Sequence, residues 1–280
     1  RRAAARTPGP RLRAPGPRRE APPPVTDPDA DADANDRDDG RDAPGRDDGA
    51  PRRNFHGRRH GKRLRPRQRA LLDTLLPQLS VPGVGRAENP ERAPVDPFAL
   101  FDPRPEAVHL EIGFGGGEHM LALAEARPEL GVIGCEPFVN GVAMCLSALE
   151  RRGIGNVRLH AGDARDLLDV LPDASVARAY ALYPDPWPKA RHAKRRLVNP
   201  ETLDPLARVL APGAELRVAT DIEIYVRHAL AVIRAHPAFD WTAERPADWR
   251  EPWEGWSPTR YEAKALREGR TPHYLTFRRR

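Results

Sequence analysis

The stretch AVHLEIGFGGGEHMLALAEA, residues 107–126, decides the fold of this chain. It starts with a short apolar run, 107–113, of the length of a buried strand, and ends with a helix-forming run, 119–126. The turn between the two runs contains three alternate glycines, Gly113, Gly115 and Gly117. Because glycine has no side chain, such a turn can be tight and its backbone can approach a ligand closely. The stretch therefore predicts a strand, a ligand-binding turn and a helix.

The rest of residues 106–280 continues this alternation. Further strands are predicted at 131–137, 156–163, 175–184, 214–220 and 275–280. Helices are predicted at 138–152, near 165–170, near 200–210 and from 222 to about 235. Strands that alternate with helices are typical of a mostly parallel sheet with helices on both faces. We therefore expect residues 106–280 to form one α/β domain.

The residues before this domain fall into two parts. Residues 1–51 have almost no large apolar side chains, so we expect them to form a disordered tail rich in Pro, Arg and Asp. Residues 52–105 begin with a basic segment, 52–69, which contains nine Arg or Lys and no acid. Leucines at helical spacing between 71 and 79 then predict a helix, and a Pro-rich linker follows over 80–105.

Charge and cysteine content exclude several classes of protein. The net charge is +6, but ten Asp against three Arg between residues 27 and 48 leave +13 on the remainder, which fits a polyanionic partner. We expect no membrane span and a cytoplasmic location, because no run of about 18 apolar residues and no apolar signal-peptide core exist. Cys135 and Cys145 have neither metal-site nor disulfide-framework spacing, and we expect no metal.

The stretch YPDPWPKARHAKRR, residues 183–196, contains the residues best suited to chemistry. Asp185 stands between two prolines, which fix the backbone and so aim the carboxylate, and Trp187 offers a flat surface for a base. Five cations that would neutralise phosphates follow: Lys189, Arg191, Lys194, Arg195 and Arg196. Together these features indicate an enzyme that acts on a nucleobase within a polynucleotide. The alternative is a solvated basic loop with a buried tryptophan.

Acidic residues at successive strand ends indicate a cofactor. Glu136, about twenty residues after the turn, suits two ribose hydroxyls, and Asp163 is placed for an adenine amino group. Glu118 stands where a dinucleotide-binding turn has its third glycine, and an acid there repels pyrophosphate but suits a cationic sulfonium. Glu111 adds negative charge. These residues favour S-adenosyl-L-methionine over a dinucleotide; a purely structural glycine turn is the alternative.

Two further segments are expected at the same end of the sheet, because open α/β sheets bind ligands beyond the carboxyl ends of their strands. Asp221 follows the strand at 214–220 and would face a ligand or cap the next helix. Thr259 and Glu262 have the spacing of a capping box, and the residues alone favour that role.

Several of these segments together resemble one family. The chain is similar to the bacterial tRNA (guanine-N7-)-methyltransferases in the order and spacing of EIGFGGGE (111–118), Glu136, GDA (162–164), YPDPWPKARHAKRRLVNP (183–200), ATD (219–221) and TRYE (259–262). The similarity covers about residues 54–280, since NFHGRRHGKRLRPRQ (54–68) resembles the basic segment that opens the family. The resemblance implies a Rossmann-like class I methyltransferase fold with a mostly parallel seven-stranded sheet. It also implies methylation of guanine at position 46 of the tRNA variable loop.

The resemblance assigns roles by matching position. Together with the turn glycines Gly113, Gly115 and Gly117, it implies cofactor contacts for Glu111, Glu136, Asp163 and Asp185, the last also being the catalytic residue. It implies substrate contacts for Lys189, Asp221, Thr259, Arg260, Tyr261 and Glu262. It implies RNA contacts for Arg191, His192, Lys194, Arg195 and Arg196. We expect tRNA as the partner, a monomer or homodimer, and no obligate protein partner.

The chemistry needs few groups. N7 of guanine has a lone pair and no proton, so it can attack a sulfonium methyl without a general base. Positioning and water exclusion should supply most of the acceleration. We expect Asp185, with Glu262 as a second candidate, to stabilise the positive charge on the purine, and Trp187 or Tyr183 to stack on the unstacked base. Two rivals remain: an amino-group methyltransferase of DNA or RNA, and a non-catalytic RNA-binding module.

Overall fold

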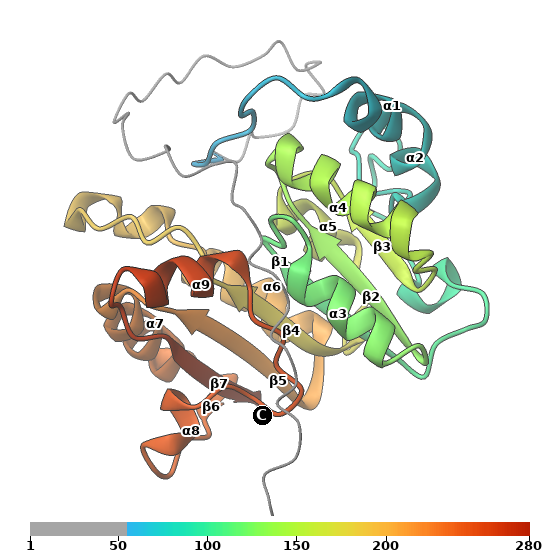
Figure 1. Cartoon of the computed structure of the whole chain (residues 1–280). Helices are drawn as coiled ribbons and strands as arrows, with labels where there is room; N and C mark the ends of the chain where they lie inside the picture. Colours follow the sequence, from blue (N-terminus) through green and yellow to red (C-terminus); the bar gives the residue numbers. More distant parts are fainter. Residues whose placement is uncertain (1–54) are drawn as a thin grey trace, which may run out of the picture. The chain divides into compact units, whose positions relative to one another are not determined.

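A seven-stranded sheet forms the centre of residues 55–280, the part of the protein that the structure, a computed structural model, describes (Figure 1). Its strand order is β3-β2-β1-β4-β5-β7-β6. The strands are β1 (Ala107–Ile112), β2 (Leu130–Cys135), β3 (Val157–His160), β4 (Val176–Leu182), β5 (Leu210–Thr220), β6 (Phe239–Trp241) and β7 (His273–Arg279). Strands β1 to β5 run parallel, and β7 runs antiparallel between β5 and β6. The predicted seven-stranded, mostly parallel sheet is confirmed.

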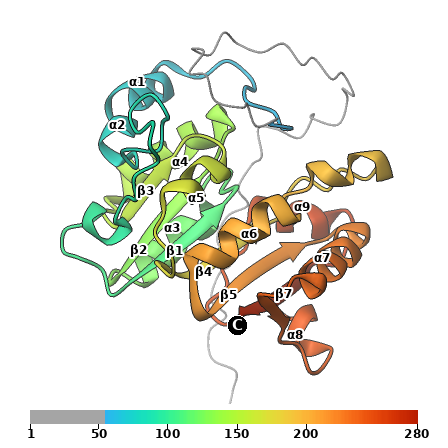
Figure 2. The ribbon, with the colours of Figure 1, turned by 180° about the vertical axis from the view of Figure 1, so that it is seen from behind.

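Helices cover both faces of the sheet. The five connecting helices are α3 (Glu118–Ala126), α4 (Val139–Arg152), α5 (Ala164–Val170), α6 (Pro200–Val209) and α7 (Glu223–Ala235). Helices α3 and α4 pack on one face around Leu121 and Leu146. Helices α5, α6 and α7 pack on the other face around Leu167, Leu206 and Ile233, as the view from behind shows (Figure 2).

The strand order places a crevice beside β1. The chain proceeds from β1 outward to β2 and β3, then returns to form β4 on the other side of β1. The loops that follow β1 and β4 therefore lead to helices on opposite faces, and they diverge at the carboxyl ends of these strands. In an open α/β sheet this switch point is where ligands bind.

Some elements differ from their predictions. The helix predicted between residues 71 and 79 is two helices, α1 (Pro66–Thr74) and α2 (Leu76–Leu79), because Pro77 has no N–H to continue the first. Strand β5 begins at Leu210, earlier than predicted, and β6 had no prediction. The remaining helices are η1 (Pro97–Leu100), η2 (Ala190–Arg195), α8 (Ala247–Arg250) and α9 (Arg260–Arg267).

Two other predictions concern the N-terminal tail and membrane-spanning helices. The predicted disordered tail, residues 1–51, lies outside the described residues. Among the helices of residues 55–280, none combines the length and the apolar character that crossing a membrane requires.

Candidate active site

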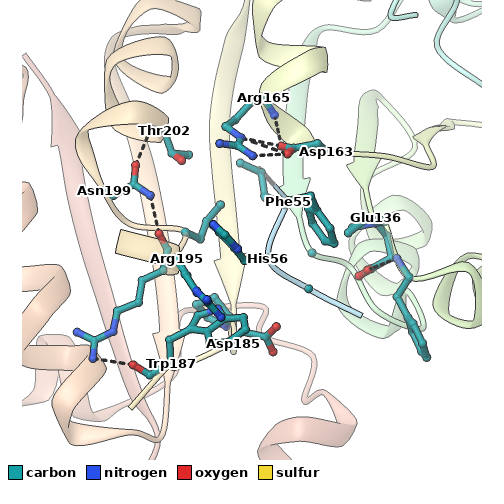
Figure 3. Close-up of a pocket in the computed structure, with 18 of the residues that line it drawn as sticks. Phe55, His56, Glu136, Asp163, Arg165, Asp185, Trp187, Arg195, Asn199 and Thr202 are labelled. Carbon is teal, nitrogen blue, oxygen red and sulfur yellow. Dashed lines mark hydrogen bonds and ion pairs between the residues drawn. The ribbon is translucent and has the colours of Figure 1, made fainter. Parts of the chain in front are cut away.

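A cavity of about 870 Å³ opens beyond the carboxyl ends of β1, β2 and β4 (Figure 3). Its lining includes these residues with a predicted role: Gly113, Gly115, Glu136, Asp163, Asp185, Lys194, Arg195, Arg196 and Tyr261. Cofactor sites are commonly about 300–1,000 Å³. The cavity is therefore large enough for a nucleoside-sized cofactor, and it gathers residues from segments far apart in the sequence.

Backbone conformation explains the glycines of the turn. Gly113, Gly115 and Gly117 have φ angles of 78°, 54° and 82°, in the left-handed region that favours glycine. At Gly117, the N-cap of α3, a Cβ would also lie 2.8 Å from Sγ of Cys145 in α4. Gly113 and Gly115 line the cavity, whereas Gly117 allows α3 and α4 to pack closely.

Glu136, just after β2, ties the glycine turn to the start of α4. Its Oε2 accepts a hydrogen bond from the Gly115 N–H (2.7 Å), and its Oε1 accepts one from the Phe138 N–H (2.9 Å). Burial raises the pKa of this carboxyl, and the two N–H donors partly offset the effect. Each oxygen retains a lone pair, so the group can still accept hydrogen bonds from a ligand.

Asp163 follows β3 and caps α5. Its Oδ1 accepts a hydrogen bond from the Arg165 N–H (2.9 Å), and its Oδ2 pairs with the Arg165 guanidinium (2.6 Å). Arg165 also reaches Glu201 at 3.2 Å. Because the ion pair neutralises its charge, Asp163 offers the cavity a hydrogen-bond acceptor more than a net negative charge.

The loop after β4 carries Asp185 into the cavity (Figure 3). The Asp185 side chain is exposed at the cavity, and partial desolvation by neighbouring atoms raises its pKa, which nearby Arg58 partly offsets. Tyr183 and Trp187 on either side have φ angles of 50° and 40°, which are rare for bulky residues. Such strained backbone persists only where the surroundings hold it, and it is concentrated at functional sites.

The cationic run 189–196 does not present all its side chains at the surface. Lys189, Arg191 and Lys194 are exposed. The Arg195 guanidinium lies over the Trp187 ring, 5.0 Å from its centroid, and the His192 ring meets the same indole edge-on. Arg196, assigned to RNA by the resemblance, is only 3% exposed. The burial of Arg196 argues against that expectation, because a phosphate contact needs an accessible guanidinium.

Glu111 also departs from its expected place. It lies at the end of β1 but is 2% exposed and does not line the cavity. Its Oε2 lies 2.5 Å from Nδ1 of His119 in α3, and the His119 ring packs against Tyr180 and Trp256. The structure thus places Glu111 in a buried pair beneath the glycine turn rather than in the cavity wall.

The predicted substrate residues near the C-terminus are mostly engaged with the protein itself. Thr259 caps α9 by accepting the Glu262 N–H (3.2 Å), so the predicted cap is confirmed. The Glu262 side chain does not complete a capping box. It is buried and accepts hydrogen bonds from Trp256 Nε1 (2.7 Å) and the Tyr274 hydroxyl (2.8 Å). Asp221 pairs with Arg270.

Tyr261 and Arg260 complete this region. The Tyr261 side chain lines the cavity beside Gly115. Arg260 forms an ion pair with Glu118. The charge of Glu118 is thus offset by Arg260, and the suitability of an acid at this position for a sulfonium stays a prediction.

The structure adds cavity residues that the motifs did not reveal. The basic segment before α1 contributes Phe55, His56 and Arg58 to the lining (Figure 3). Its backbone is attached to the first turn of α4, where the Val139 N–H donates to the Arg59 carbonyl (2.9 Å). Only the resemblance of residues 54–68 to the family's basic segment hinted at this position. Within residues 55–280, no group of three or more His, Cys or acidic side chains is arranged to hold a metal ion.

The strand order with its antiparallel β7, and a cavity at the switch point lined by strand-end acids, define a class I methyltransferase. A sequence profile described as "Putative methyltransferase" matches residues 105–275. The chain is 60% identical over 242 residues to the tRNA (guanine-N(7)-)-methyltransferase of Ruegeria sp. (strain TM1040), covering 86% of this chain and 94% of that protein. It is 59% identical over 235 residues to the enzyme of the same name from Paracoccus denitrificans (strain Pd 1222), covering 84% and 98%.

Among solved structures, that of the 16S rRNA methyltransferase KamB is similar with a TM-score of 0.46 and 17% identity, over 70% of this chain and 94% of that one. The sequence relatives decide the family. The chain belongs to the tRNA (guanine-N(7)-)-methyltransferase family.

Proposed function

We propose that this protein transfers a methyl group from S-adenosylmethionine to N7 of guanine in tRNA. The observation that carries the proposal is the 60% identity to a tRNA (guanine-N(7)-)-methyltransferase across 94% of that relative's length. A match of this extent includes both the cavity and the cationic run. The finer assignment, guanine 46 in the variable loop, rests on the resemblance of the motifs alone.

The donor set of the cavity fits S-adenosylmethionine. Glu136 offers a charged acceptor at the end of β2, where two ribose hydroxyls would reach it, and Asp163 offers an acceptor for an adenine amino group after β3. Gly113 and Gly115 leave the cavity wall without side chains beside β1. When bound, the cofactor supplies an electrophilic methyl group on a sulfonium.

The protein's own residues position the guanine and stabilise the charge that it acquires. N7 of guanine is already a nucleophile, so no residue has to remove a proton. Asp185 is the acid in the loop after β4 that faces the cavity, whereas Glu262 is buried with both oxygens hydrogen-bonded. We assign to Asp185 the stabilisation of the positive charge that the purine acquires.

The cationic side chains beside the cavity suit tRNA phosphates. Lys189, Arg191 and Lys194 are exposed along the run that follows Asp185. The basic segment attached to α4 adds exposed cations, among them Arg63 and Arg65. Two basic elements flanking one cavity would hold the RNA backbone while one base enters. We further propose that the protein acts in the cytoplasm as a monomer or homodimer without an obligate protein partner.

The test is methylation of an unmodified tRNA transcript with labelled S-adenosylmethionine, followed by nucleoside mass spectrometry. We expect 7-methylguanosine, and we expect it to disappear when guanine 46 of the transcript is replaced by adenine. An N-methylated exocyclic amino group would indicate the rival amino-group methyltransferase. Tight tRNA binding with no heat of cofactor binding at millimolar concentration would indicate a non-catalytic RNA-binding module.

A further inference from the structure

One arginine of the cationic run lies inside the protein. Arg196 donates from its Nε to the carbonyl oxygen of Pro186 (2.9 Å) and from an Nη to the carbonyl oxygen of Trp187 (3.0 Å). Its own carbonyl oxygen accepts a hydrogen bond from Asn199 Nδ2 (2.6 Å), at the N-cap of α6. Arg196 therefore joins the start of α6 to the loop that carries Asp185.

The neighbouring cations behave differently. Lys189, Arg191 and Lys194 are exposed, whereas Arg196 is 3% exposed. A planar guanidinium presents its donors in a fixed fork, which suits two adjacent carbonyl oxygens and does not need an anion. The run thus has three exposed cations, two side chains, His192 and Arg195, that pack on the Trp187 ring, and one, Arg196, that binds backbone.

The Asp185 loop, residues 184–188, needs hydrogen-bond donors from outside the loop to hold its conformation. Residues 184–188 read PDPWP, and the three prolines have no N–H with which to form backbone hydrogen bonds. Trp187 also has a φ of 40°, a conformation that its surroundings must maintain. The guanidinium of Arg196 and the stacked guanidinium of Arg195 both act at this residue.

We propose that Arg196 is a positioning residue that fixes the Asp185 loop, and that it does not contact RNA. The role rests on the proposed function, because Asp185 is assigned there to the reacting guanine. Arg196 touches neither the cofactor nor the base in this assignment. It acts by keeping the carbonyls of Pro186 and Trp187, and with them Asp185, in one place.

The experiment compares Arg196→Ala and Arg196→Lys with Lys194→Ala, a change at an exposed cation two residues away. Turnover is measured at saturating tRNA and cofactor, per site that binds S-adenosylhomocysteine. The tRNA dissociation constant is measured across a series of salt concentrations. A displacement of about 1 Å in a catalytic group costs roughly 100-fold, so we expect kcat to fall by about that factor in Arg196→Ala.

The salt dependence separates the two roles. A lost phosphate contact lowers the slope of log affinity against log salt by about 1. We expect that change in Lys194→Ala and no change in Arg196→Ala. Arg196→Lys keeps the charge but loses the fork, so its kcat should also fall at least tenfold. A reduced salt slope in Arg196→Ala, or wild-type kcat in Arg196→Lys, would overturn the proposal.

Amide hydrogen exchange distinguishes positioning from a general loss of stability. We expect faster exchange in peptides covering 183–189 and unchanged exchange in β1 and β4; uniformly faster exchange would contradict a positioning role. If Arg196→Ala does not fold, Arg196→Lys supplies both measurements. Failure of the wild-type protein to methylate tRNA would refute the proposed function instead, while the salt slopes would still show whether Arg196 contacts RNA.

Discussion

Replacing Glu136 with glutamine tests the cofactor site while preserving the size of the side chain. The carboxylate accepts hydrogen bonds from the Gly115 and Phe138 N–H groups, one on each oxygen. A carboxamide has one oxygen, so one N–H must face an NH₂ group and lose its bond. A hydrogen bond to a charged acceptor contributes about 1.5–3 kcal/mol. Because burial already disfavours the charge, we expect a net loss in unfolding free energy of about 1–2 kcal/mol.

The effect on cofactor binding should be larger. The carboxamide can accept from one ribose hydroxyl and has no charge, so about 1.5–3 kcal/mol of binding is lost. That loss raises the Kd of S-adenosylmethionine roughly 10- to 100-fold. The kcat at saturating cofactor should change by less than about threefold, since a ribose contact is equally strong before and during methyl transfer.

The assay is calorimetric titration with S-adenosylmethionine, combined with urea unfolding. Asp248→Asn, in α8 and outside the cavity lining, is the control. Both backbone N–H groups that Asp248 accepts, from Glu244 and Arg245, reach one oxygen, Oδ2, so the carboxamide oxygen can keep both. It should leave the Kd unchanged. A Kd within twofold of wild type for Glu136→Gln would refute the assignment of Glu136 to the ribose.

Asp185, Trp256 and His109 can each be tested by a single substitution. Asp185→Asn should lower the single-turnover rate about 100-fold with unchanged tRNA affinity; a wild-type rate would exclude charge stabilisation. Trp256→Phe removes the indole N–H that donates to the buried Glu262 carboxyl and should lower the free energy of unfolding by about 1.5–3 kcal/mol. Trp253→Phe removes an N–H that donates to the neutral Thr276 hydroxyl and should cost only about 1 kcal/mol; equal losses in urea unfolding would show that the bond to Glu262 contributes no more than a neutral one. Burial, with nearby cations, lowers the pKa of His109 to about 4. Its folded pKa thus lies below the unfolded value, so roughly 3 kcal/mol of stability present above pH 6.5 should be lost as the pH falls towards 4. His109→Gln should not show this loss in urea unfolding. A loss as steep as that of the wild type would contradict the assignment to His109.

Periodicity and the glycine turn predicted six of the seven strands, and the expectation of seven came from the resemblance to the family. The parallel strands carry apolar residues at consecutive positions, as in β2, or at alternate ones, as in β3, and each connecting helix has its own apolar stripe, so both are visible locally. Strand β6 was not predicted because its three residues, Phe239–Trp241, are too few to show a pattern. The break between α1 and α2 was missed because the leucine spacing continues across Pro77.

The sequence could predict only those site residues that directly follow a strand, because their position in the chain fixes where they lie. Glu136, Asp163 and Asp185 each follow a parallel strand, and the carboxyl ends of such strands meet at one edge of a sheet. Side-chain direction and pairing depend on tertiary contacts that no local pattern contains. For this reason the sequence did not show that Arg196 turns inward, or that Glu111 pairs with His119.

A crystal structure with S-adenosylhomocysteine most directly tests whether acids at the strand ends hold the cofactor. We expect the ribose hydroxyls within hydrogen-bond distance of Glu136, the adenine beside Asp163, and the sulfur facing the Asp185 loop. A ligand bound outside the cavity, or one bound inside with its ribose turned away from Glu136, would contradict it.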